Sequence, residues 1–187
     1  MTHDSDIPRR RSIRLSEYDY ASAGAYFVSI VAQGRLCLFG EVVDGEMCLN
    51  GAGKMVRRVW EGMAERFVYV VVDAFVVMPN HVHGVVFLGQ TAATTDAFTG
   101  ETGGDVPTLG DVVRVFKSVT TVEYGRGVRG LGWERFEKRL WQRNYYERVV
   151  RNGSEMRAVR EYIVNNPRNW ALDRENPGGG GGGEGGV

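Results

Sequence analysis

The stretch Val76–Leu88, VVMPNHVHGVVFL, decides how the chain is interpreted. Two apolar runs flank a short polar insert, and the insert holds two of the three histidines in the chain. Side chains alternate between the two faces of a β-strand, so a strand that starts here brings His81 and His83 side by side on one face. Two imidazoles in this arrangement can hold one divalent cation. The alternative is a pair of polar residues at a strand end. Other features of the chain are needed to choose between these two interpretations.

Length and composition predict one globular domain. The chain has 187 residues, of which 43% are hydrophobic, which is enough for a sizeable core. No apolar run approaches the roughly 20 residues of a membrane span, and the start, MTHDSDIPRRRSIR, lacks the apolar segment of a secretory signal. Cys37 and Cys48 form no CxxC motif. These features favour a reduced, cytoplasmic protein that does not bind a membrane.

Charge is distributed unevenly along the chain although its formal net value is zero. Residues 126–151 contain seven Arg and one Lys against three Glu, and a second cluster of Arg occupies positions 9–14. The guanidinium group matches phosphate oxygens well, so these segments are candidates for contact with nucleic acid. Ordinary solvated surface and a codon bias towards Arg are the alternatives.

Hydrophobic periodicity predicts an alternation of strands and helices. We expect strands at Tyr26–Ala32, Val68–Met78, His81–Leu88 and Tyr146–Val150, with short extended pieces at 36–41, Glu46–Leu49 and 140–142. We expect helices at 52–65, at 109–124 and from an N-cap at Ser154 through Asn165, with a break over 125–132. Strands 68–78 and 81–88 should form a hairpin. The order indicates a ferredoxin-like βαββαβ α+β sandwich with an antiparallel sheet and an added C-terminal helix.

The predicted domain is bounded by segments of different composition. Residues 1–18 are expected to form a basic N-terminal arm and residues 19–177 the folded domain. Within the domain, residues 90–107 are rich in Thr, Gly and Asp and predict a flexible loop. Residues 178–187 include eight glycines and predict a disordered tail.

The last predicted helix offers partners for the two histidines. Tyr162 and Asn166 are four residues apart and therefore share one helical face. An amide oxygen is a reasonable ligand for Mg²⁺ or Mn²⁺. Tyrosine is a poor nucleophile at neutral pH because its pKa is about 10, but it becomes useful when a metal polarises the phosphorus it attacks. Spacing alone favours the alternative, in which Tyr162 is a rim residue whose ring packs on the sheet.

Four motifs occur in order: VVMPNHVHGVV, FKSVT, LWQRNYYERVVRN and REYIVNNP. Together with RRSIRL and AYFVSI near the start, they resemble the HUH-type single-tyrosine transposases of bacterial insertion sequences. The chain is most similar to the REP-associated tyrosine transposases, and the resemblance runs from about residue 10 to residue 177.

This resemblance implies a catalytic site. It implies Mg²⁺ or Mn²⁺ held by His81, His83 and Asn166, where the insertion-sequence branch more often has Gln, and a nucleophilic Tyr162 that forms a 5′-phosphotyrosine link. The implied activity is metal-dependent cleavage and transfer of single-stranded DNA near hairpin elements, as in DNA transposition and recombination. The implied protein is a monomer or a homodimer.

Candidate DNA contacts come from the basic segments and their aromatic neighbours. We expect phosphate contacts from Arg114, Lys117, Arg143, Arg148 and Arg151. Tyr145 and Tyr146 either stack on bases or serve as ordinary strand aromatics, and Tyr146 is the rival nucleophile.

Two other functions stay open at this point. One is a phosphodiesterase with paired histidine motifs, although such enzymes usually carry two HxT or HxS elements and this chain has a single HxH. The other is a domesticated, non-catalytic protein that binds single-stranded nucleic acid on the same fold.

Overall fold

The structure, a computed structural model, describes residues 23–89 and 107–178. The predicted arm over 1–18 therefore lies outside the described residues, as do the predicted loop except Pro107 and the predicted tail except Gly178.

A four-stranded antiparallel sheet forms the centre of the molecule, with the strand order β4-β5-β1-β6. Its strands are β1 (Gly24–Val31), β4 (Val70–Val77), β5 (His81–Leu88) and β6 (Tyr146–Val150). Val77 pairs with Val82, so the predicted hairpin of β4 and β5 is confirmed. A separate hairpin joins β2 (Gly40–Val43) to β3 (Glu46–Leu49). The order of the four main strands is that of a ferredoxin-like sandwich, which confirms the predicted fold class.

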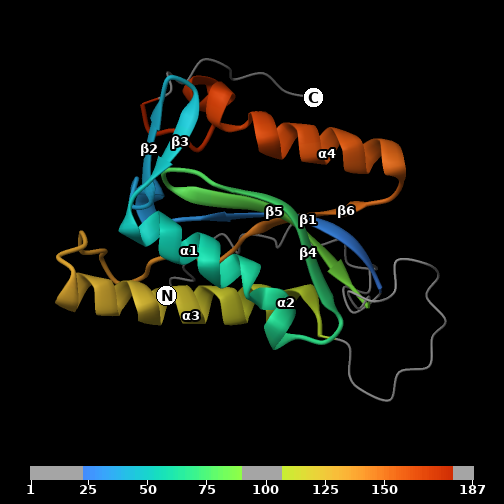
Figure 1. Cartoon of the computed structure of the whole chain (residues 1–187), viewed down its shortest axis with the longest axis horizontal. Coiled ribbons are helices and arrows are strands. Elements are labelled where there is room, and N and C mark those ends of the chain that lie inside the picture. Colours follow the sequence, from blue (N-terminus) through green and yellow to red (C-terminus); the bar gives the residue numbers. More distant parts are fainter. Residues whose placement is uncertain (1–22, 90–106, 179–187) are drawn as a thin grey trace, which may run out of the picture.

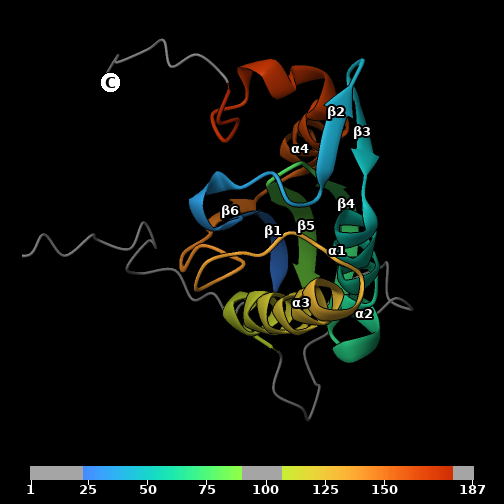
Figure 2. The ribbon, with the colours of Figure 1, turned by 90° about the vertical axis from the view of Figure 1, so that its left-hand side faces the viewer.

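Helices cover both faces of the sheet (Figures 1 and 2). They are α1 (Gly51–Glu61), α2 (Met63–Arg66), α3 (Leu109–Gly130) and α4 (Gly153–Asn165), with the short 3-10 helices η1 (Gln33–Arg35) and η2 (Pro167–Leu172). Figure 1 shows α1 and α3 below the sheet and α4 above it. Within the described ranges, no helix combines the length and the apolarity needed to cross a membrane.

Each face of the sheet has its own apolar cluster. Val28 and Val82 belong to the larger cluster, under α1 and α3, whereas Phe27 and Val85 belong to the smaller one under α4. Because neighbouring residues of a strand point to opposite faces, Val82 anchors β5 in the larger core. His81 and His83 therefore face α4.

Two helix predictions were wrong. We expected a break over 125–132, but α3 continues through Gly127 and ends only at Gly130. A Cβ on Gly127 would lie 2.2 Å from the ring of Trp133, so this glycine allows close packing rather than ending the helix. The expected helix over 52–65 is divided at Gly62, which has non-helical ψ.

The N-cap of α4 was also predicted wrongly. Asn152, not Ser154, accepts the backbone N–H of Glu155, at 2.9 Å. The helix nevertheless ends at Asn165 before Pro167, as predicted, and the chain then tightens into η2.

Candidate active site

The two histidines lie at the start of β5, in the middle of the sheet. His81 pairs with Val31 and His83 with Ser29 across the β1–β5 ladder, while β4 flanks them on the other side. Both imidazoles are buried, and their ring centroids are 4.4 Å apart. The backbone of a central strand thus fixes the spacing of the pair. The predicted placement of both residues on one face is confirmed.

Asn80 fixes the orientation and the tautomer of His81. Its side-chain Nδ2 donates to two backbone carbonyls, those of Arg35 at 3.0 Å and Glu175 at 2.7 Å. Only Oδ1 is then left to face Nδ1 of His81, at 2.9 Å. Because Oδ1 only accepts, Nδ1 of His81 must carry the proton. A neutral His81 therefore presents the lone pair of Nε2 to the site.

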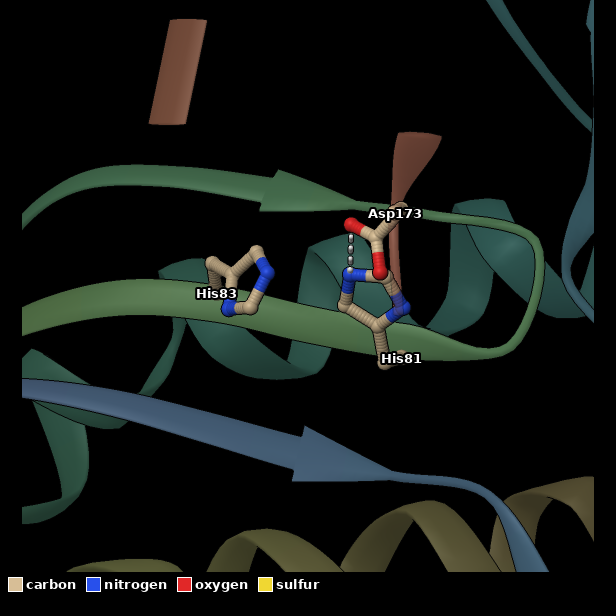
Figure 3. A group of neighbouring side chains, drawn as sticks. All are labelled: His81, His83 and Asp173. Carbon is tan, nitrogen blue, oxygen red and sulfur yellow. Dashed lines mark ion pairs between the residues drawn. The ribbon is translucent and has the colours of Figure 1, made fainter. Parts of the chain in front are cut away.

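Asp173, which sequence reasoning missed, completes a group of three side chains that could hold a metal ion. It follows η2, and its Oδ2 lies 3.8 Å from Nε2 of His81. Figure 3 shows the carboxylate of Asp173 pointing from the C-terminal segment towards His81. His81 and His83 lie next to each other on β5. One ligand atom from each of the three residues lies within 4.8 Å of the others. An imidazole pair with a carboxylate is a donor set that suits a divalent cation.

Helix α4 brings Tyr162 and Asn166 to the histidines. The hydroxyl of Tyr162 lies 3.2 Å from Nε2 of His83, and the residue as a whole is 47% exposed. Asn166 is the C-cap of the helix and is buried. The two side chains lie on the same side of the helix because they are one turn apart. The contact of Tyr162 with His83 agrees with the sequence prediction, whereas the role of Asn166 as a metal ligand stays a prediction.

Three buried polar atoms at this site have no hydrogen-bond partner among the residues that the structure describes. They are Nε2 of His81, Nδ1 of His83 and Oδ1 of Asn166. Buried polar atoms are normally satisfied, so three such atoms beside a carboxylate indicate a missing partner. A divalent cation would satisfy the lone pairs of Nε2 of His81 and Oδ1 of Asn166, and the residues present therefore fit the metal that the resemblance implies.

Burial governs the charge state of the site. Burial lowers the pKa of His81, and the carboxylates of Asp173 and Glu175 oppose this. Burial, followed by the neighbouring His81, lowers the pKa of His83 well below its ordinary value. Burial and Asp173 raise the pKa of Tyr162. At neutral pH the imidazoles are therefore uncharged, as metal ligands must be, and the phenol keeps its proton.

The predicted DNA contacts fall on both sides of the sheet. Tyr146 and Arg148 project from β6 towards α4, because Tyr146 contacts Phe27 at 6.2 Å between ring centroids and shares a cavity with Arg148 and Tyr162. Arg143 and Arg151 are exposed just before and just after β6.

The other three predicted contacts lie on the α3 side. Lys117 donates to the carbonyls of Gln142, Arg143 and Asn144, at 2.9, 3.3 and 3.2 Å. Its ammonium also lies 5.3 Å from the ring centre of Tyr145, and burial lowers its pKa to about 8. Lys117 thus holds the segment before β6 in place instead of offering donors to phosphate. Arg114 on α3 pairs with Asp111 at 3.1 Å.

Comparison with known proteins gives two informative matches. A Haemophilus influenzae protein, itself uncharacterised, is 35% identical over 182 residues, covering 92% of this chain and 96% of the relative. The solved structure of a REP-associated tyrosine transposase bound to a REP hairpin superposes with a TM-score of 0.53 and 21% identity, over 82% of this chain and 73% of that one. No model of a known protein family matches the chain. The structural match agrees with the resemblance inferred from the four motifs and shows a common fold.

Proposed function

Since the chain belongs to one family with the Haemophilus influenzae protein and has the fold of a REP-associated tyrosine transposase, we propose that it cleaves and rejoins single-stranded DNA through Tyr162. The observation that carries the proposal is the contact of 3.2 Å between the Tyr162 hydroxyl and His83, beside buried polar atoms that find no hydrogen-bond partner in the described part of the chain. A strand with hairpin elements is the proposed substrate, because the transposase with the similar fold is bound to a REP hairpin in its solved structure.

The proposed reaction is a transesterification. The Tyr162 oxygen attacks a backbone phosphorus, the bond from phosphorus to the 3′ oxygen breaks, and the 5′ phosphate stays on the tyrosine. The phenolic proton passes to water, and the departing 3′ oxygen takes up a proton. Attack by a free 3′ hydroxyl reverses the step, so rejoining needs no ATP.

The residues around Tyr162 have separate tasks in this proposal. His81, His83, Asp173 and Asn166 would hold the divalent cation, which supplies Lewis-acid polarisation of a non-bridging phosphate oxygen. Helix α4 and the Phe27 ring, whose centroid is 5.9 Å from that of Tyr162, hold the nucleophile in place. Arg143, Arg148 and Arg151 are the proposed phosphate contacts along β6.

A covalent-adduct assay tests the proposal. The full chain is incubated with Mn²⁺ and labelled single strands from the flanks of its own gene, and the products are separated on a denaturing gel. We expect a protein–DNA adduct that survives denaturation, with the modified peptide containing Tyr162 by mass spectrometry. Binding without any adduct on all flanking strands would instead support the non-catalytic DNA-binding protein, and release of unattached fragments would support a phosphodiesterase.

A further inference from the structure

A cavity opens beside Tyr162, and His81 and His83 are not among the residues that line it. It encloses about 330 Å³ and is lined by Phe27, Tyr146, Arg148, Ala158, Val159 and Tyr162. Tyr162 is therefore shared by two sites: its hydroxyl contacts His83, while its ring forms a wall of this cavity.

Three aromatic rings shape the cavity. The rings of Tyr146 and Tyr162 both stand steeply on Phe27, at 65° and 79° to its plane. Phe27 is buried under them, whereas the two tyrosines are 49% and 47% exposed. The result is an apolar slot with a closed floor and accessible aromatic walls, which is the kind of surface on which a nucleobase stacks.

Arg148 supplies a charge beside the slot. It is exposed and makes no ion pair with any residue in the described part of the chain. A guanidinium next to an aromatic slot complements a base that carries its own phosphate. The volume lies at the lower end of the roughly 300–1,000 Å³ of ligand cavities, which suits one nucleotide and not a longer stretch.

We propose that this cavity binds one nucleotide next to the scissile phosphate, with its base stacked in the slot and its phosphate on Arg148. The inference rests on the proposed function, because it uses the same DNA strand and the same tyrosine. It adds that the protein holds a base directly adjacent to the bond it cleaves. Stacking on a ring needs no particular hydrogen-bond pattern, so any of the four bases should enter.

Filling the slot with a larger side chain tests the inference without requiring the cleavage reaction. Ala158 is exposed on α4 and lines the cavity, so Ala158→Leu should occupy the space of the base while preserving helix propensity and charge. Val164 is 71% exposed on the same helix and does not line the cavity, so Val164→Leu is the matched control. Tyr146→Ala, which removes one wall, is the second variant.

The measurement is equilibrium binding in EDTA of two fluorescent probes: a twelve-nucleotide oligothymidylate and the same backbone with every base removed. The ratio of the two affinities isolates the contribution of the bases from that of the phosphates. We expect this ratio to fall roughly fivefold or more in Ala158→Leu and in Tyr146→Ala, the loss of one stacked base, and to stay unchanged in Val164→Leu.

The outcomes separate this inference from the proposed function. An unchanged ratio in both slot variants, with folded protein, would overturn the nucleotide site even if the wild type forms its tyrosine adduct. A reduced ratio would support the site even if no adduct were found, in which case the proposed cleavage reaction alone fails.

Discussion

The hydroxyl of Tyr162 lies 3.2 Å from Nε2 of His83, although 79 residues separate the two in the chain. The contact joins a helix end to the centre of a sheet. It requires α4 to lie across the strands, where Val159 and Ile163 bury themselves against the smaller apolar cluster. The packing that stabilises the helix therefore also positions the side chain of Tyr162, so that its hydroxyl contacts Nε2 of His83.

Removing only the hydroxyl tests the nucleophile. Tyr162→Phe keeps the ring on Phe27 and deletes the attacking oxygen, so it should form no adduct while single-strand binding stays within about twofold of wild type. Its free energy of unfolding should change by no more than about 1 kcal/mol, because one partly exposed hydrogen bond is lost. Tyr146→Phe is the control and should form the adduct. The opposite pattern would make Tyr146 the nucleophile.

The motifs in the sequence predicted this part of the site because they lie on regular elements. A strand period of two aligns His81 with His83, and a helix turn aligns Tyr162 with Asn166. Each pair could therefore be deduced from local spacing. That the two pairs meet was implied by the family resemblance, not by periodicity, since no local pattern reports a contact over 79 residues.

Other parts of the site left no signal in the sequence. Asp173 follows a 3-10 turn after Pro167, a segment without apolar periodicity, and only the fold brings it to His81. Lys117 is similar: its helix was predicted, but the three carbonyls that bind it belong to an irregular segment before β6. In both cases the regular elements on either side position the irregular segment.

Asp173 should contribute to metal binding. Asp173→Asn removes the negative charge beside His81 and should weaken Mn²⁺ binding by about tenfold or more, since ligand charge governs affinity for a divalent cation. His81→Ala should abolish detectable binding in the same titration. Glu175→Gln is the matched control, because that carboxylate instead pairs with Arg35 at 2.8 Å. Equal losses in Asp173→Asn and Glu175→Gln would show a general effect of charge and not a ligand.

Asn80 should increase the affinity for the metal indirectly, by orienting His81. Asn80→Ala removes the acceptor that keeps the proton on Nδ1 and the donors that join Arg35 to Glu175. We expect a roughly 10- to 100-fold loss of Mn²⁺ affinity. We also expect a loss of about 1–3 kcal/mol in the free energy of unfolding, because the side chain is fully buried. Nitrogen-detected NMR of His81 separates the two effects: the wild type should be the Nδ1–H tautomer and Asn80→Ala a mixture.

The arginines around β6 should set the salt dependence of DNA binding. Each of Arg143→Gln, Arg148→Gln and Arg151→Gln should reduce the slope of log affinity against log salt by roughly 0.7, the value for one phosphate contact on a single strand. Arg57→Gln is the control, because Arg57 is exposed on α1, across the sheet from Tyr162. A slope that changes only in the control would move the DNA path to the α1 face.

The stability of the metal-free protein should fall on mild acidification. Burial lowers the pKa values of His81 and His83 below the ordinary 6.5, so the unfolded chain binds more protons than the folded one just below that pH. Both states are neutral above it, and the folded state is therefore destabilised as the pH falls from about 6.5 towards the lowered values. Asp173 and Glu175 face His81 and reduce this effect for that ring, which leaves His83 as the larger contributor. In EDTA, the unfolding midpoint of the wild type should drop more steeply between pH 7 and pH 5 than that of His83→Gln, which keeps a polar side chain but does not titrate. Parallel curves for the two proteins would mean that His83 is not the group that couples folding to pH.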